Sequence, residues 1–327
     1  MKNHKPLVSV WMITYNQEEL IKEAIDSVLM QEVDFEYEIV IGEDCSTDRT
    51  REVLEEYNRK YPGKFKLLFR EKNLGITANF ADTFRHCSGK YIAPCEGDDY
   101  WTDPLKLKKQ VDILENDDSI SLVFQNGRIN YFDENLNLVK EYDLHEDVPS
   151  GYVEANQLVR FKRMTLTAGT MFKNVNVGEF LSINNSFMRF VDTPTFLYLA
   201  KFGRLYYQNE VTSVYRVLST GGVRSARYLV ESAMLDIQYY RFLGIYFSEF
   251  NLKTLLRYPL CDMYYLIAFG YFKKGEIINF MKYLGLAFFT KPTYFLKKSS
   301  FQFLKKLKLI DQDQMIRQQE VLQTSLT

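Results

Sequence analysis

The chain has 327 residues, which allows one large domain or one domain with an appendage, and its formal net charge of −1 gives no electrostatic basis for binding nucleic acid. Its four cysteines show no CxxC spacing, so we expect reduced thiols of a cytoplasmic protein and neither a disulfide framework nor a zinc site. The apolar run near the N-terminus is too short for a signal peptide, and no stretch of about 18 apolar residues predicts a membrane-spanning helix.

The first hundred residues alternate between short apolar runs and amphipathic segments. The apolar runs predict buried strands at residues 7–13, 37–42, 65–69 and 91–93. The amphipathic segments between them predict helices at residues 18–31, 49–61 and 76–87. Because strands and helices alternate across short loops, we expect a parallel sheet with helices on both faces.

Polar residues follow three of these strands at the points where the strands end. They are Thr14-Tyr15-Asn16, Glu43-Asp44 and Glu96-Gly97-Asp98-Asp99. Ligands of such sheets bind beyond the carboxyl ends of the strands, so the three groups are expected to meet on one rim as a nucleotide-phosphate site. The glycine-rich dinucleotide and P-loop motifs are absent. The charge of the nucleotide phosphates must therefore be neutralised in another way, by a metal or by basic side chains. Lys72 and Arg70 after the third strand are candidates, with a solvated basic pair as the alternative.

The stretch YIAPCEGDDYWTDPLKLKKQ places three carboxylates, Glu96, Asp98 and Asp99, in one turn after a buried strand. Like charges so close together are unfavourable unless a cation neutralises them. Mg²⁺ and Mn²⁺ bind carboxylate oxygens and complete their shells with phosphates and water, so we interpret the turn as a metal–diphosphate site, with a solvated acidic loop as the alternative. Asp103 as N-cap and Pro104 at the first helical position predict a helix directly after the turn.

The rest of the chain alternates less regularly and then becomes helical. Strands are expected at residues 120–124, 167–173, 205–208 and 211–216, the last two paired, and a hairpin at residues 128–132 and 138–142. Helices are expected at residues 152–161, 195–201, 228–250, 253–272 and 276–289, with Pro259 and Pro292 as breaks.

Five segments, in this order and spacing, resemble the family 2 glycosyltransferases with the GT-A fold. They are VSVWMITYN, EIVIGEDCSTDRT, NLGITANFADTFRHCSGKYIAPCEGDDYW, TAGTMFKN and FVDTPTFLYLAKFGRLYYQNEVTSVYRV. The resemblance covers Val8 to about Arg224, and it is closest to bacterial enzymes that build capsules, O-antigens or exopolysaccharides. It implies an α/β catalytic domain over residues 1–224, with a Rossmann-like mixed sheet and helices on both faces, and a C-terminal helical extension over residues 225–327.

The resemblance implies ligand roles for the polar rim. The segment Thr14-Tyr15-Asn16 would line the nucleotide site, to which Lys72 is added from its place after the third strand. Asp44 would bond the nucleobase, with a helix N-terminal carboxylate as the alternative role. A proline that is usual before this segment is replaced by Ile13, which should change little. The histidine that relatives often carry near the later Gly-Gly turn is absent, which leaves Arg216 and Arg224 as basic residues for the donor phosphates.

The family's metal motif, DxD, falls on Glu96-Gly97-Asp98. The resemblance implies that Asp98 ligates a divalent metal bridging the diphosphate, and that Asp99 faces the donor sugar or ribose. Glu96 replaces the usual first Asp, and its longer arm would reach a metal-bound water or a ribose hydroxyl. Asp192 matches the base that deprotonates the acceptor hydroxyl, with an N-cap for the following helix as the alternative.

The implied reaction is transfer of a sugar from a nucleoside-diphosphate donor, with UDP favoured, to a hydroxyl of a growing or lipid-linked glycan. A metal neutralises the leaving diphosphate, and a single base opposite it predicts in-line displacement with inversion. A non-catalytic nucleotide- or glycan-binding homologue is the alternative, which the retained Asp98, Asp99 and Asp192 disfavour. A sugar-nucleotide pyrophosphorylase is less favoured, because residues 14–20 supply no glycine-rich basic loop.

Lysines interleave with aromatic and aliphatic residues near the C-terminus, in FMKYLGLAFFTKPTYFLKKSSFQFLKKLKLI. One interpretation is a face that binds a membrane surface, with lysines on anionic lipid. The other is an ordinary helical subdomain with solvated lysines, and recruitment of a partner enzyme remains open. The family resemblance favours peripheral association with the inner face of the cell membrane, where lipid-linked acceptors lie.

Overall fold

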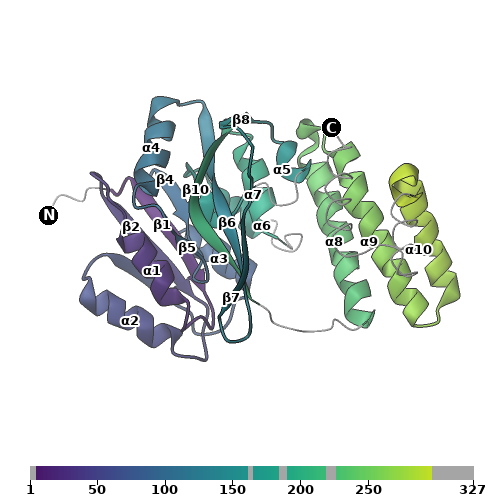
Figure 1. The fold of residues 1–327 in the computed structure, drawn as a ribbon, viewed down its shortest axis with the longest axis horizontal. Coiled ribbons are helices and arrows are strands. Elements are labelled where there is room, and N and C mark those ends of the chain that lie inside the picture. Colours follow the sequence, from purple (N-terminus) through teal and green to yellow (C-terminus); the bar gives the residue numbers. More distant parts are fainter. Residues whose placement is uncertain (1–4, 161–164, 184–189, 219–225, 297–327) are drawn as a thin grey trace. The chain divides into compact units, whose positions relative to one another are not determined.

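The computed structural model describes residues 5–160, 165–183, 190–218 and 226–296. The chain divides into two compact units (Figure 1). The first comprises residues 1–222 with 245–252, and the second comprises residues 223–244 with 253–327. The predicted boundary between residues 224 and 225 lies outside the described residues.

A mixed sheet organises the first unit. Its described strands run in the order β3-β2-β1-β4-β9-β6-β10-β5, with β7 paired to β6 and β8 paired to β10. Their bounds are β1 Val8–Thr14, β2 Tyr37–Glu43, β3 Phe65–Phe69, β4 Tyr91–Pro94, β5 Tyr100–Trp101, β6 Ile120–Phe132, β7 Leu138–Asp143, β8 Gly151–Val153, β9 Thr170–Lys173 and β10 Arg204–Leu218. Strands β3, β2, β1 and β4 are parallel, which confirms the predicted parallel sheet for this part, while β9 is antiparallel to β4 and β6.

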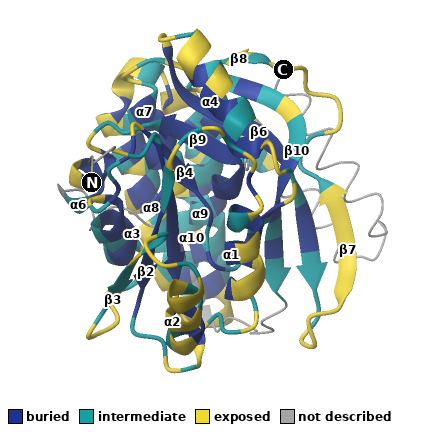
Figure 2. Cartoon of the chain, turned by 90° about the vertical axis from the view of Figure 1, so that its left-hand side faces the viewer, coloured by how far each residue is buried: buried dark blue, intermediate teal, exposed yellow. Residues whose placement is uncertain are grey.

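Helices cover both faces of the parallel strands. The helices of this unit are α1 Ile21–Leu29, α2 Thr50–Lys60, α3 Ile76–Phe84, α4 Lys106–Asn116, α5 Gln157–Arg160, α6 Val177–Ile183 and α7 Asp192–Leu199. Every residue of β1 is buried, and so is every residue of its neighbour β4, which lies among the buried elements in Figure 2. Successive side chains of a strand point to opposite faces of the sheet. Val10 and Met12 belong to one core with apolar residues of α1, α2 and α4. Trp11, between them, contacts Phe80 of α3 with ring centroids 3.9 Å apart, so α3 covers the other face.

The middle section differs from the sequence-based expectation in three places. The helix predicted at residues 152–161 is wrong at its start, because Gly151–Val153 pairs with β10 as strand β8. The paired strands predicted at residues 205–208 and 211–216 are one strand, β10, which runs parallel to β6. Its register shifts between Gln208 and Val211, and such a bulge interrupts the apolar pattern without ending the strand. The strand expected at residues 167–173 starts with a 3₁₀ turn, Thr167–Gly169.

The helix after the acidic turn starts later than the sequence predicted. Tyr100–Trp101 pairs with β10 as strand β5, and α4 begins only at Lys106. Asp103 accepts a hydrogen bond from the Leu105 amide at 2.9 Å, and its carbonyl accepts one from the Lys106 amide at 3.1 Å. Because these bonds form a separate turn, Asp103 is not the N-cap and Pro104 does not occupy the first helical position.

The second unit is built from helices. They are α8 Ala226–Tyr246, whose last two residues belong to the first unit, α9 Lys253–Lys273 and α10 Ile277–Thr290. Their core joins residues of all three helices, namely Val230, Ala233, Ile237, Cys261, Tyr264, Ile267 and Ala287. Pro259 lies inside α9, so the predicted break there is wrong; the buried Leu256 and Cys261 on either side keep the helix packed despite one lost hydrogen bond. Within the described residues, none of the helices combines the length and apolarity that a transmembrane segment requires.

Candidate functional site

Three polar segments meet at the carboxyl ends of β2, β1 and β4. Strand β1 lies between the other two in parallel register, with Thr14 opposite Glu43. The pairing continues beyond the strands, because the Asp44 amide donates to the Thr14 carbonyl and the Gly97 amide donates to the Ile13 carbonyl, each at 3.0 Å. The predicted convergence on one rim is therefore confirmed, whereas the ligand roles of the individual residues stay predictions.

The segment after β1 is fixed to the segment after β2 by Asn16. Its φ of +53° is a left-handed conformation that asparagine tolerates better than most residues, and its Oδ1 accepts a hydrogen bond from the Thr47 amide at 2.8 Å. Thr14 is buried and donates to Gln17 Oε1 at 2.8 Å. Tyr15 is 44% exposed, so its side chain is open to a ligand.

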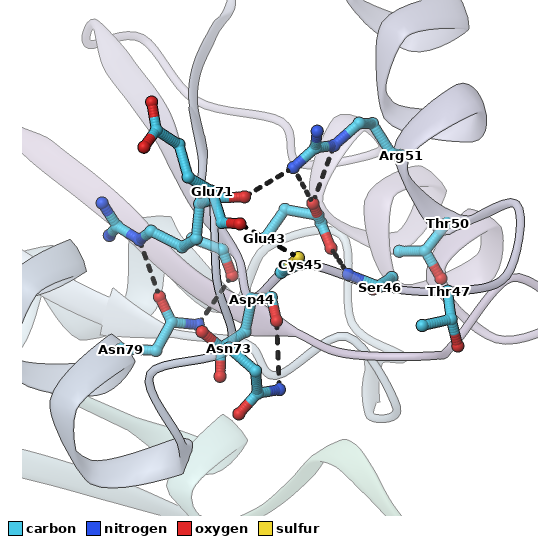
Figure 3. A network of polar contacts seen from close by, with 12 residues as sticks. Glu43, Asp44, Cys45, Ser46, Thr47, Thr50, Arg51, Glu71, Asn73 and Asn79 are labelled. Carbon is cyan, nitrogen blue, oxygen red and sulfur yellow. Dashed lines mark hydrogen bonds and ion pairs between the residues drawn. The ribbon is translucent and has the colours of Figure 1, made fainter.

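Asp44 holds the loop that leads into α3. Its buried carboxylate accepts hydrogen bonds from the amides of Leu74 at 2.8 Å and Gly75 at 3.0 Å. Asn73 Nδ2 donates to the Asp44 carbonyl at 3.1 Å and closes the loop against the strand end (Figure 3). Gly75 has a φ of +81°, which residues with a Cβ rarely adopt. A carboxylate has about four lone-pair positions, so this anchoring is compatible with the predicted contact to a nucleobase.

A surface pocket of about 560 Å³ opens beside this loop. It is lined by Phe69, Arg70, Glu71, Lys72 and Leu74. Arg70 is held inside the protein by an ion pair with Asp82 at 2.7 Å and a hydrogen bond to Asn79 at 3.2 Å. Lys72 is exposed and lines the same pocket, so it is the better placed of the two basic residues to meet a ligand.

The acidic turn is fitted closely against the segment after β1. A Cβ on Gly97 would lie 2.4 Å from Gln17 Oε1 and 2.9 Å from Thr14 Oγ1, so a residue with a side chain here would have to push these groups aside. Asp99 is 1% exposed, and its Oδ1 accepts a hydrogen bond from the Arg216 amide at 3.1 Å. These contacts give the turn a single well-defined conformation.

Arg216 of β10 ties the turn to the rest of the unit. Its Nη1 donates to the Asp98 carbonyl at 2.8 Å, and its Nη2 forms an ion pair with Glu23 of α1. The Tyr100 ring lies 4.3 Å from the guanidinium carbon. Because these protein groups occupy the guanidinium, its contacts are those of a positioning residue, and its predicted contact to phosphate stays a prediction. Arg224 lies outside the described residues.

Asp192, from a distant part of the chain, joins the acidic turn. Burial raises the pKa of Glu96 well above its ordinary value, and the charges of Asp99, Asp192 and Asp98 raise it further. Burial and Asp98 raise the pKa of Asp99, with a contribution from Asp192, against the opposing effect of Arg216. Burial also raises the pKa values of Asp98 and Asp192. Four carboxylates therefore share one electrostatic environment.

Asp192 lies at the start of α7 and is not its N-cap. The N-cap residue is Val191, and no side chain caps this helix, so the alternative role for Asp192 is wrong. Its side chain is exposed to water, although the surrounding protein is dense enough to raise its pKa by desolvation. A carboxylate that water can reach beside an acidic turn is available to accept a proton from a bound hydroxyl.

The donor set suits a hard divalent cation. All four side chains offer oxygen atoms, and the mutual rise of their pKa values is a repulsion that a cation would relieve. No group of three or more His, Cys, Asp or Glu residues in the described part of the chain is arranged to hold a metal by itself. A cation held by Asp98 would therefore need further oxygen ligands from a diphosphate and water, as Mg²⁺ usually does.

Comparison with known proteins places this arrangement in a family. The model of glycosyl transferase family 2 matches residues 9–176, more than half of the 327 residues. The chain belongs to glycosyl transferase family 2. The matched segment contains the three polar groups of the rim, and Asp192 lies beyond it.

Curated relatives resemble part of this family 2 chain. An uncharacterized protein of Mycobacterium tuberculosis is 44% identical over 126 residues, which are 38% of this chain and 36% of the relative. The putative teichuronic acid biosynthesis glycosyltransferase TuaG of Bacillus subtilis is 35% identical over 114 residues (35% and 44%), and the putative glycosyltransferase EpsE of that species is 36% identical over 113 residues (35% and 40%). The chain thus matches less than half of the length of each of these relatives.

Two solved structures share the fold of this family 2 chain. TarS residues 1–349 of S. aureus, in complex with UDP-GlcNAc, gives a TM-score of 0.51 at 18% identity and covers 84% of this chain and 90% of TarS 1–349. The mannosyltransferase PcManGT of Pyrobaculum calidifontis, in complex with GDP-Man and Mn²⁺, gives a TM-score of 0.51 at 16% identity and covers 93% of this chain and 89% of PcManGT. The GT-A architecture implied by the sequence motifs is confirmed.

Sequence patterns in this family 2 chain did not reveal several residues that shape the site. Gln17 accepts a hydrogen bond from Thr14 and acts against the rise in the pKa of Asp98, and Glu23 pairs with Arg216. Gln17 directly follows the Thr-Tyr-Asn segment, a position that would have justified naming it. Glu23 lies on α1 among other charged surface residues, and only the fold shows that it faces β10.

The charge of the acidic turn should make the stability of this family 2 chain depend on pH and on metal. The raised pKa values mean that the folded state binds more protons than the unfolded chain at pH values above the ordinary 3.8 and 4.5 of Asp and Glu. Without metal, the free energy of unfolding contributed by these groups is therefore lost as the pH rises through the raised values. We expect a lower melting temperature at about pH 8 than at about pH 5 in EDTA, and a smaller difference with Mg²⁺.

The measurement is a series of thermal melts of wild type, Glu96→Gln and the surface variant Asp112→Asn. The Glu96→Gln change should flatten the pH dependence, because it removes the carboxylate on which the other three act. Asp112 is an exposed residue of α4, and its variant should follow the wild type. If the melting temperature of Glu96→Gln depended on pH as strongly as that of the wild type, the acidic turn would not be the source of the pH dependence.

Proposed function

We propose that this chain transfers a sugar from a nucleoside-diphosphate sugar to a hydroxyl group of a glycan. The observation that carries the proposal is the position of Asp192, which comes from a separate helix and interacts with Glu96 and Asp99. One set of carboxylates can hold the cation that a diphosphate needs, and a separate, water-accessible carboxylate can serve as a base. Transfer from a sugar nucleotide requires both groups side by side.

The donor would bind across the rim. The pocket beside the Asn73–Gly75 loop has room for a nucleobase and is lined by Lys72. Asp44 binds the amide of Leu74, which also lines the pocket, and Tyr15 is open to the ligand. Asp98 would hold Mg²⁺ or Mn²⁺, with Glu96 as a contributor through water, and Asp99 would face the ribose or the sugar. When bound, the metal neutralises the negative charge that develops on the leaving diphosphate. Arg216 keeps the turn in position for this contact.

The acceptor half of the reaction would depend on Asp192. Its carboxylate takes the proton from the acceptor hydroxyl while the hydroxyl oxygen attacks the anomeric carbon and the bond from that carbon to the diphosphate breaks. The raised pKa of Asp192 makes it a stronger base than an ordinary aspartate. Since a single base acts opposite the leaving group, the sugar should be transferred with inversion.

The named relatives support the substrate classes without fixing them. TarS and PcManGT were solved with UDP-GlcNAc and with GDP-Man and Mn²⁺, and TuaG is named for teichuronic acid biosynthesis. We therefore propose a nucleotide-sugar donor, with UDP favoured, and a growing or lipid-linked glycan of a bacterial surface polysaccharide as acceptor. Transfer at the cytoplasmic face of the membrane follows from that choice of acceptor.

The test is release of nucleoside diphosphate from a panel of UDP- and GDP-sugars, with and without Mn²⁺, using water or added oligosaccharides as acceptors. We expect one donor to be turned over in the presence of Mn²⁺, and EDTA to stop the reaction. Nucleotide binding without turnover of any donor would instead favour the non-catalytic homologue.

A further inference from the structure

The second unit exposes an apolar stripe along α10. Ile278 is 86% exposed, Met281 59% and Phe289 80%. A helix turns by about 100° per residue, so these side chains lie on one side of α10, opposite the buried Ala287. Gly285 lies on the same side, and a Cβ there would meet open space. We call these four residues the α10 stripe; contiguous exposed apolar surface of this kind marks an interaction site.

The α10 stripe is not needed for packing within its unit. Helix α10 is attached to α9 through its other side, where the Cys261 thiol donates to the Ala287 carbonyl at 3.3 Å. Tyr283 stacks on Tyr271 with ring centroids 5.6 Å apart. Because these contacts hold the helix, the exposed side chains of the stripe are not needed to attach α10 to α9 within the described residues.

Lysines accompany the α10 stripe. The sequence from residue 273 to residue 291 contains four lysines and one carboxylate, Glu276. Lys273, Lys274 and Lys282 are exposed, and within the described residues none of them forms an ion pair. Helical geometry places Lys282 on the same side of α10 as the stripe. The positive charge of Lys282, which none of the described ion pairs neutralises, therefore lies beside the apolar side chains.

We propose that the α10 stripe inserts into the interface of an anionic membrane, with the lysines on lipid phosphates. An apolar helix face bordered by lysines has the chemistry of an interfacial helix, which buries its apolar side chains at the headgroup boundary. Each lysine near an anionic surface adds about 1 kcal/mol, or roughly fivefold in partitioning. A second copy of the chain fits less well, because pairing two identical stripes would bring the Lys282 side chains together. This binding is separate from the transfer chemistry and does not depend on it.

The experiment is co-sedimentation of the full chain with phosphatidylcholine vesicles that contain or lack phosphatidylglycerol. Ile278→Asp and Phe289→Asp should lose binding to the anionic vesicles, and Lys282→Glu should weaken it by more than about fivefold, since a positive charge is replaced by a negative one. Leu235→Asp is the matched control, because Leu235 is 51% exposed on α8 of the same unit, and it should bind like the wild type. All four positions are exposed, so melting temperatures should stay within a few degrees of the wild type.

Three results would overturn the proposal. The first is a wild-type chain that ignores both vesicle types. The second is binding that survives in Ile278→Asp and Phe289→Asp, which would place the membrane contact elsewhere. The third is a smaller assembly in these variants than in the wild type by light scattering without lipid, which would make the stripe an interface between copies. Nucleoside-diphosphate release in solution should be the same in all variants, so a failure here is distinct from a failure of the transferase proposal.

Discussion

Replacing Asp192 with Asn should lower kcat for sugar transfer by roughly a hundredfold to ten-thousandfold, because the loss of a general base typically costs that much. Asparagine keeps the shape of the side chain but cannot accept the proton of the acceptor hydroxyl. Donor binding should stay close to that of the wild type, because the proposed donor contacts come from the rim and the acidic turn. The measurement is steady-state transfer at saturating acceptor, together with titration of a nucleoside diphosphate in the presence of Mn²⁺.

Asp112→Asn is the matched control for this substitution. It changes an exposed aspartate of α4 in the same way and should leave both kcat and donor affinity unaltered. Transfer by Asp192→Asn at nearly the native rate would mean that another group is the base. Equal losses in donor binding and in transfer would assign Asp192 to the donor site instead.

Replacing Asp98 with Asn should abolish metal-dependent donor binding. The change removes the carboxylate that we propose as the protein's ligand to the cation. Loss of a group that only supports a metal ligand typically lowers affinity by about tenfold to a hundredfold. Loss of the ligand itself should therefore lower the affinity for a nucleoside diphosphate with Mn²⁺ by more than about a hundredfold. The backbone of the turn should persist, because Arg216 binds the carbonyl of Asp98 and not its side chain. Calorimetric titration of the nucleoside diphosphate in Mn²⁺ and again in EDTA separates the metal-dependent part of the binding from the metal-independent part.

The weak, metal-independent part of nucleotide binding is the internal control for Asp98→Asn. It should be equal in wild type and variant, since Asp44 and the pocket beside the Asn73–Gly75 loop are separated from the acidic turn by β1. Binding of the diphosphate with Mn²⁺ at wild-type strength would remove Asp98 from the metal site.

The sequence predicted the part of the fold in which the apolar pattern of each strand reflects how the strand is buried. Strand β1 is buried on both faces, so it is apolar at all positions except Ser9 and Thr14, and β3 was predicted at its observed bounds. The polar groups after β1, β2 and β4 converge because parallel strands end at one edge of a sheet. Long-range pairing was harder to predict. The bulged β10 interrupts its own pattern with Asn209 and Glu210, and only its pairing with β6 shows that it is one strand.

The candidate site also has a part that the sequence predicted and a part that only the fold reveals. Local spacing was enough to single out the acidic turn, and the resemblance to the family singled out Asp192. Neither indicated that Asp44 would be used to fix the Asn73–Gly75 loop, or that Glu23 would hold Arg216, because both contacts join segments that only the fold brings together. The elevated pKa values also depend on burial, which no spacing rule supplies.

The most direct test of a metal–nucleotide site at the acidic turn is the melting temperature of wild type and Asp98→Asn with a panel of nucleoside diphosphates, each with and without Mn²⁺. A ligand that binds the folded state raises the melting temperature by mass action. We predict a rise in the wild type with one nucleotide, UDP being favoured, that requires Mn²⁺ and is absent in Asp98→Asn. No rise with any nucleotide, or an equal rise in the variant, would contradict a metal–diphosphate site at this turn.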